Sequence, residues 1–242
     1  MLAGTEKALS GMTAIRALMS RAIDFAGLFP PAGLPMETAV RNYIRYRNSD
    51  DAWALGRFVA PVARALETGL EPDALSLVSG KLEHAGEILY VEGGPEIRPN
   101  GARAKIRTGG LEPELFPSTK TVAEFIDECA HLKLPFKATA GLHHAIRGEY
   151  PLSYEPASPS TTMHGFLNVL LAASFAWHGG PVQPVIEERN LTNFQFEADT
   201  ISWRHHCLSA AQIAEARRDF IISFGSCSFE EPMRELRDLG LL

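Results

Sequence analysis

Two lysines stand in strand-like segments that end in glycine. Lys105 lies in Ala-Lys-Ile-Arg-Thr-Gly-Gly, and Lys137 lies in Phe-Lys-Ala-Thr-Ala-Gly-Leu. A lysine is rarely buried in a strand unless its charge is paired or used. Two such lysines on successive strands favour an enzyme in which a lysine amine takes part in the reaction. The alternative is that each lysine forms a structural ion pair with an inward-facing acid, for which Asp24 and Glu92 are the candidates.

The alternation of side chains along a strand predicts which residues share a face. Lys105 and Arg107 fall on one face and Ile106 on the other, and in the second segment Lys137 and Thr139 lie together. Because helices cover the outer face of a barrel strand, we expect the charged side chains to point inward. Burial and neighbouring positive charge both favour a neutral amine, which is a nucleophile toward carbonyl compounds.

The elements that must position these residues are short apolar runs alternating with helical patterns. This order is typical of parallel strands joined by crossover helices. The predicted strands cover residues 22–29, 56–61, 75–79, 87–92, 103–108, 135–140, 194–199 and 220–225, and the predicted helices cover 37–47, 121–132, 165–177, 210–218 and 230–239. Eight strands predict a single (β/α)8 TIM-barrel domain over residues 1–242, with an N-terminal amphipathic helix in residues 1–20. An open doubly wound sheet is the alternative fold.

The two lysine segments resemble the deoxyribose-phosphate aldolase family of class I aldolases. The resemblance lies in Lys-x-x-Thr-Gly on one strand and Lys-Ala-Thr-Ala-Gly on the next, and it extends to the Ile23-Asp24 start of the first strand. It implies a TIM barrel that needs no cofactor. It also implies that Lys105 forms a Schiff base with the substrate, that Lys137 lowers the pKa of Lys105, and that Asp24 is a polar group at the cavity floor.

Other polar residues near strand ends are candidates for proton transfer and substrate binding. Glu92 ends the fourth predicted strand and is the candidate proton-relay carboxylate. The predicted substrate-binding residues are Arg107, Thr108, Thr139, His143, His144, His164, Asn168 and Ser226. The chain departs from the family in residues 140–144, where the family has a phosphate-binding Gly-Gly-Ile-Arg turn. A sugar phosphate is therefore disfavoured, although Arg107 or the turn at Ser226 could hold an anion.

The histidines suggest a second kind of site. His143 and His144 follow the sixth predicted strand and His164 opens a helix, so all three could stand over one mouth of the barrel. Neutral imidazoles can bind a metal, but adjacent residues face opposite ways and the spacing matches no known metal-site signature. We expect no metal, and we expect Cys227, just beyond the last strand, to be a buried and inert thiol.

The composition excludes several classes of protein. A net charge of −6 does not fit the basic surface that nucleic-acid-binding proteins carry. No apolar stretch is long enough to span a membrane. Three cysteines without a close pair favour a reducing cytoplasm. The combined prediction is a cytoplasmic, cofactor-independent lyase that acts on a small carbonyl or anionic substrate, with a homo-oligomer as a possible assembly. A metal-dependent lyase or hydrolase and a non-catalytic barrel that binds an acidic ligand are the alternatives.

Overall fold

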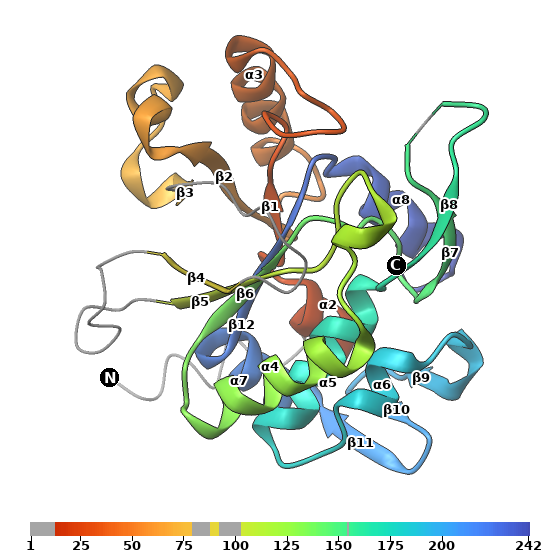
Figure 1. The fold of residues 1–242 in the computed structure, drawn as a ribbon. Coiled ribbons are helices and arrows are strands. Elements are labelled where there is room, and N and C mark those ends of the chain that lie inside the picture. Colours follow the sequence, from red (N-terminus) through yellow and green to blue (C-terminus); the bar gives the residue numbers. More distant parts are fainter. Residues whose placement is uncertain (1–12, 79–87, 92–102, 154) are drawn as a thin grey trace, which may run out of the picture.

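The main element of the fold is a seven-stranded sheet with the order β3-β2-β1-β12-β6-β5-β4 (Figure 1). The computed structural model describes residues 13–78, 88–91, 103–153 and 155–242. The strands of this sheet are β1 (Ile23–Phe25), β2 (Leu55–Pro61), β3 (Leu75–Val78), β4 (Ile88–Val91), β5 (Arg103–Arg107), β6 (Phe136–Thr139) and β12 (Ile221–Ser226). Six of them run parallel, and β4 runs antiparallel to β5.

The predicted closed TIM barrel is wrong, although the fold is of the α/β class. The six parallel strands curl into a half-barrel, and the edge strands of the whole sheet, β3 and β4, do not pair with each other. The segment predicted as the seventh barrel strand forms β9 (Phe194–Phe196) in a separate antiparallel sheet with β10 (Thr200–Trp203) and β11 (His206–Ser209). The half-barrel therefore lacks the strand that would carry it toward closure.

A small hairpin lies in the stretch between the sixth strand and the helix that follows it. Strands β7 (Gly148–Pro151) and β8 (Ser160–Met163) pair antiparallel in a two-stranded sheet. In Figure 1 this hairpin projects from the body of the molecule.

The helices that the 3.6-residue periodicity predicts are all present, with small shifts at their ends. The α-helices described are α2 (Ala14–Met19), α3 (Met36–Arg47), α4 (Thr119–His131), α5 (Phe166–Trp177), α6 (Gln183–Glu187), α7 (Ala210–Asp219) and α8 (Glu230–Asp238). Helix α2 falls within the predicted N-terminal helix, whose first part lies outside the described residues. None of the helices in the described residues is both long and apolar enough to cross a membrane.

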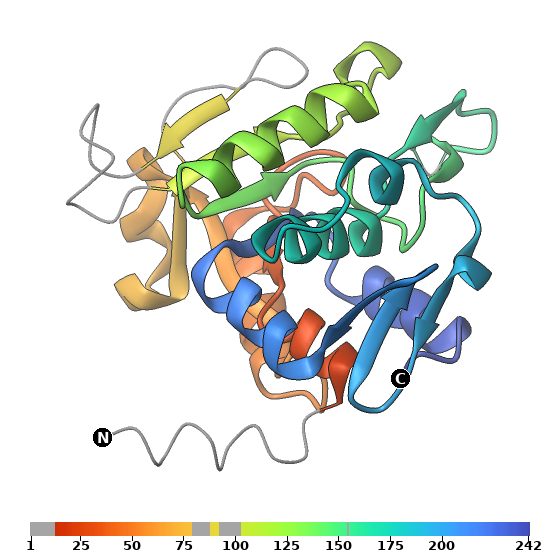
Figure 2. The ribbon, with the colours of Figure 1, turned by 90° about the horizontal axis from the view of Figure 1, so that it is seen from below.

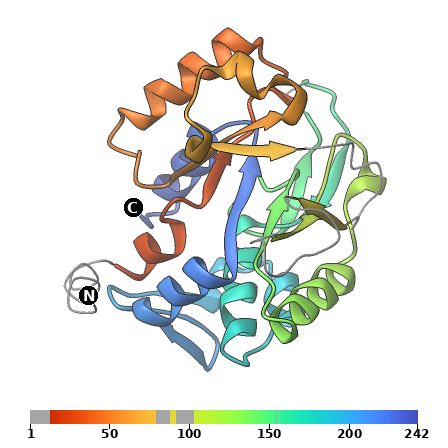
Figure 3. The same ribbon diagram turned by 90° about the vertical axis from the view of Figure 1, so that its left-hand side faces the viewer.

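Four helices pack against one face of the sheet and form its core. Helix α3 contacts β2, α5 and α7 contact β12, and α4 contacts β5. Figures 2 and 3 show these helices and the half-barrel from two further sides. The strand side chains that face the helices are apolar and fully buried, namely Ile23, Phe58, Ile106, Phe136 and Phe224. Because side chains alternate along a strand, their neighbours point to the concave face, and that face carries the charged residues.

Candidate active site

The two lysines lie directly beside each other on the concave face. Lys105 on β5 and Lys137 on β6 are partners in the parallel register, so their side chains leave the sheet side by side. The Lys137 ammonium donates to Asp24 Oδ2 and to Ser76 Oγ, the latter at 2.7 Å. Strands β1 and β3 therefore fix the position of Lys137 and leave Lys105 beside it.

Asp24 is the counter-ion at the centre of this cluster. Besides the Lys137 ammonium, its carboxylate accepts hydrogen bonds from Ser223 Oγ at 2.9 Å and from the backbone N–H of Arg57 at 2.8 Å. Burial by itself would raise the pKa of Asp24, but the Lys137 charge and these hydrogen bonds outweigh it, so the pKa lies below its usual value. Asp24 is thus ionised at neutral pH and keeps Lys137 occupied.

The amine of Lys105 has no such partner. The residue is only 4% exposed, and its Nζ forms no hydrogen bond or ion pair with the residues that the structure describes. Burial first, and then the adjacent charge of Lys137, lower the pKa of Lys105 to about 8, while Asp24 acts in the opposite direction. A substantial fraction of Lys105 is therefore a neutral, nucleophilic amine near physiological pH.

Lys105 opens onto a cavity of about 540 Å³ at the carboxyl ends of the parallel strands. Arg107, Thr139, His143 and Cys227 share its wall, and apolar side chains from the loop after β1 complete it. The Arg107 Nε donates to the backbone oxygen of Gly109 at 2.8 Å. The cavity is large enough for a small organic substrate, and it exposes that substrate to one amine, one imidazole and one thiol.

His143 and Cys227 form a polar pair in the cavity wall. The Cys227 Sγ and His143 Nδ1 atoms lie 4.0 Å apart, and Nδ1 is 3.5 Å from the Glu231 carboxylate. Burial opposes a charged imidazole, but the contacts with Cys227 and Glu231 outweigh it and raise the pKa of His143 to about 9. His143 is therefore a proton donor at neutral pH.

Two glycines give the cavity its shape where β5 and β6 end. Gly141 has a φ of +73°, and a Cβ at this position would lie 2.6 Å from the Gly109 Cα atom. A side chain here requires both a left-handed backbone and the displacement of neighbouring backbone. The close approach of these two chain segments therefore depends on glycine.

We expect Gly141→Ala to lower the free energy of unfolding by more than the roughly 1–3 kcal/mol of left-handed strain alone. Gly179→Ala is the matched control, because Gly179 has a φ of +76° but no atom lies within 4 Å of the point that its Cβ would occupy. Urea unfolding of both variants measures the difference. Equal losses would show that the contact with Gly109 contributes nothing.

Two predicted substrate-binding residues instead hold the ends of the strands. The Thr108 hydroxyl is buried and donates to the backbone oxygen of Ala140 at 2.6 Å, which joins the ends of β5 and β6. Ser226 Oγ accepts from the backbone N–H of Ser228 at 3.3 Å. Both side chains act in positioning the loops around the cavity rather than in lining it.

Three further predicted residues lie away from the cavity wall. His164 is fully buried between Pro117 O and the Arg147 guanidinium, and burial lowers its pKa to about 4. Asn168 is also fully buried, with its amide donating to the backbone oxygens of Val185 and Glu188 at 2.7 and 2.8 Å. His144 stacks on Tyr150 and pairs with Glu235 at 3.4 Å. The three histidines are therefore not gathered at one point.

The described residues contain no group of three or more His, Cys, Asp or Glu side chains that could hold a metal ion. Glu92, the predicted proton relay, lies outside the described residues. The sequence interpretation missed Ser76, Ser223 and Arg57, which complete the cluster around Lys137 and Asp24. A polar residue in an apolar strand was the available signal, but serine alone is too common to be singled out.

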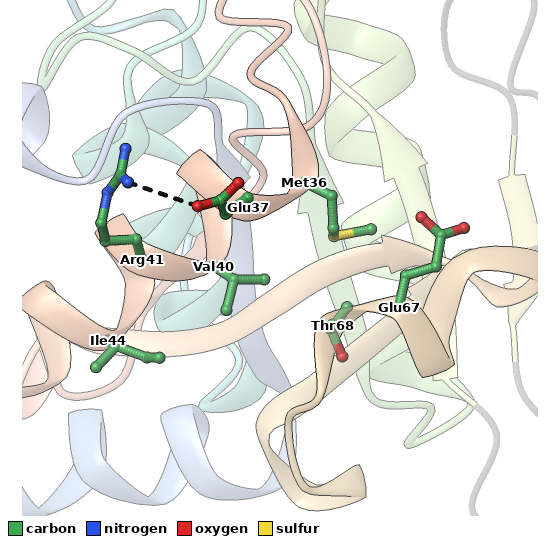
Figure 4. A pocket seen from close by; sticks show the side chains of 7 residues that line it. All are labelled: Met36, Glu37, Val40, Arg41, Ile44, Glu67 and Thr68. Carbon is green, nitrogen blue, oxygen red and sulfur yellow. Dashed lines mark ion pairs between the residues drawn. The ribbon is translucent and has the colours of Figure 1, made fainter.

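A second hollow lies on the outside of the molecule, and its lining shares no residue with the lysine cavity. It runs between α3 and the 3-10 helix η1 (Val62–Thr68) and is lined by Met36, Glu37, Val40, Arg41, Ile44, Glu67 and Thr68 (Figure 4). Glu37 and Arg41 face each other there at 4.0 Å. This lining holds neither an amine nor a thiol, and its charged side chains are exposed, so the lysine cavity is the candidate active site.

Similarity to known proteins gives no information on the function of this cavity. Comparisons with protein-family models, curated proteins and solved structures find no significant match to this chain.

Proposed function

We propose that this protein is a Schiff-base-forming lyase, similar in chemistry to class I aldolases, that acts on a small carbonyl compound. The observation that carries the proposal is the contrast between two adjacent lysines. Lys137 is held by Asp24 and Ser76, whereas the Lys105 amine has no partner in the described residues, has a pKa of about 8 and opens onto the cavity. A nucleophilic amine needs this combination of access and a lowered pKa.

The reaction would begin with attack of the neutral Lys105 amine on the carbonyl carbon. The resulting carbinolamine loses water to give a protonated imine, which forms a C=N bond and retains the substrate carbons. The bond between the α- and β-carbons of the substrate then breaks, and its electron pair moves toward the imine to give an enamine. A base takes the proton of the β-hydroxyl, and the β-carbon leaves as the carbonyl group of the first product. Protonation of the enamine and addition of water release the second product and restore the amine.

The cavity wall holds groups suited to the acid steps. His143 carries a proton at neutral pH and could donate it to the departing water, and Thr139 lies in the same wall. Lys137 and Asp24 stabilise each other and place a fixed positive charge beside Lys105. That charge disfavours the ammonium form of Lys105 before the substrate binds.

The test is trapping with borohydride in the presence of small aldehydes, ketones and keto acids, with the modified residue identified by peptide mass spectrometry. We expect the reduced adduct on Lys105. We also expect the initial rate of adduct formation to rise with pH with a midpoint near 8, because only the neutral amine attacks. An ordinary lysine would show a midpoint near 10.5. Adducts spread over exposed lysines, with no midpoint near 8, would contradict the proposal.

A further inference from the structure

Another cavity, separate from the lysine cavity and from the hollow beside α3, opens at the opposite end of the parallel strands. It has a volume of about 400 Å³ and lies between α2, α7 and the amino-terminal ends of the strands. Five arginines line it, namely Arg21 before β1, Arg57 on β2, Arg103 at the start of β5, and Arg217 and Arg218 at the end of α7. The cavity at the carboxyl ends shares none of these arginines.

The charges in this arginine pocket are not balanced by acids among the described residues. Asp24 is the only acid among the described residues of the lining, and its carboxylate already binds Lys137. Arg218 pairs with Asp219, but the other four arginines form no ion pair with any residue in the described part of the chain. Like charges that lie close together repel one another, and an anion bound among them would relieve that repulsion.

Arg217 shows this imbalance most clearly. The residue is 8% exposed, and its terminal nitrogens donate to the backbone oxygens of Ile221 and Ser20, which are neutral groups. Its Nε is buried without any hydrogen-bond partner. Among the described residues, it is the only buried side-chain nitrogen or oxygen that lacks one. Burial lowers the pKa of Arg217 to about 10, while the charge of Asp24, which also binds Lys137, acts in the opposite direction, so the guanidinium stays charged. A buried charge of this kind is costly unless an opposite charge accompanies it.

We propose that the arginine pocket binds a phosphoryl group, either as a free inorganic anion or as part of a small phosphorylated molecule. Guanidinium groups present planar pairs of donors that match the oxygens of a phosphoryl group, and several of them neutralise its double charge. The pocket is a binding site distinct from the lysine cavity. A phosphoryl group there supplies counter-charge to the arginines that have no ion pair in the described part of the chain.

The test is a titration of the full chain with inorganic phosphate, pyrophosphate and glycerol 3-phosphate, followed by calorimetry and by thermal unfolding. Sodium chloride keeps the ionic strength constant in every sample. We expect saturable binding and a rise in Tm that increases with ligand concentration. The three probes distinguish a free anion from an organic phosphate by which of them binds most tightly. Absence of saturable binding by all three overturns the proposal.

Variants separate this pocket from general ionic effects. Arg21→Gln and Arg103→Gln each remove one lining charge that has no ion pair in the described part of the chain, and we expect each to weaken binding at least tenfold. Arg41→Gln is the matched control, since Arg41 is exposed on α3 and pairs with Glu37, and its affinity should equal that of the parent. Equal weakening in all three variants would mean non-specific attraction and would also overturn the proposal. Borohydride trapping at Lys105 does not depend on this outcome, so failure of one proposal is distinguishable from failure of the other.

Discussion

Lys105→Ala should abolish the borohydride adduct and reduce turnover of a responsive carbonyl substrate by at least about 10³-fold, as loss of a catalytic nucleophile does. The fold should survive, because the variant removes a buried amine that has no partner among the described residues and so relieves a desolvation cost. Intact-mass spectrometry of the trapped protein measures the first effect, and urea unfolding measures the second.

Lys120→Ala is the control for this substitution. Lys120 is exposed on α4 and lies 3.7 Å from Glu124, so its loss should leave both trapping and turnover unchanged. An adduct that persists in Lys105→Ala and maps to Lys137 would show that Lys137, and not Lys105, is the nucleophile. An unchanged turnover in Lys105→Ala would refute the iminium mechanism altogether.

The placement of the lysines was predictable because strand alternation is a local property. Residues two apart share a face whatever the rest of the sheet does, so Lys105 and Arg107 had to lie opposite Ile106. The covering helices then decide which face is polar, and their apolar residues were also visible in the sequence. The structure adds the register, which sets Lys105 directly beside Lys137.

The failure of the barrel to close was not predictable, because the alternation of side chains along a strand does not determine the direction of that strand or its partner. The segment 92–102 between β4 and β5 is shorter than the dozen or so residues that a parallel crossover usually needs, and these two strands pair antiparallel. The apolar run at Phe194–Phe196 joins the short strands β10 and β11 next to it in the chain. Sequential antiparallel neighbours form a sheet without a crossover helix, and this removes β9 from the barrel.

The identity of the lysine that is free could not be read from the sequence either. Asp24 was open to pairing with each lysine, and the choice depends on Ser76 and Ser223, which come from strands far away in the chain. These serines hold the ion pair on the side of Lys137. The difference between a structural lysine and a nucleophile therefore arises from packing between β1, β3 and β12 rather than from either lysine motif.

Asp24→Asn should be the most destabilising single change in the site, with an expected loss of about 3–5 kcal/mol in the free energy of unfolding. The amide can still accept hydrogen bonds, but the buried Lys137 ammonium loses its counter-ion. The pKa of Asp24 is lowered in the folded state, so its contribution to stability is present above the unfolded value of about 3.8 and disappears as the pH falls through the lower folded value. The parent should lose this stability in acid, and Asp24→Asn should lack that part of the pH dependence.

The double variant Asp24→Asn, Lys137→Met tests whether the loss comes from the unpaired charge. Removing both charges leaves no buried ion, and the methionine keeps much of the lysine's apolar stem, so we expect most of the lost stability to return. Urea unfolding of the parent, both single variants and the double variant gives the coupling energy between the two side chains. If the two single losses simply add, the ion pair does not hold Lys137 in place, and the explanation for a free Lys105 amine fails with it.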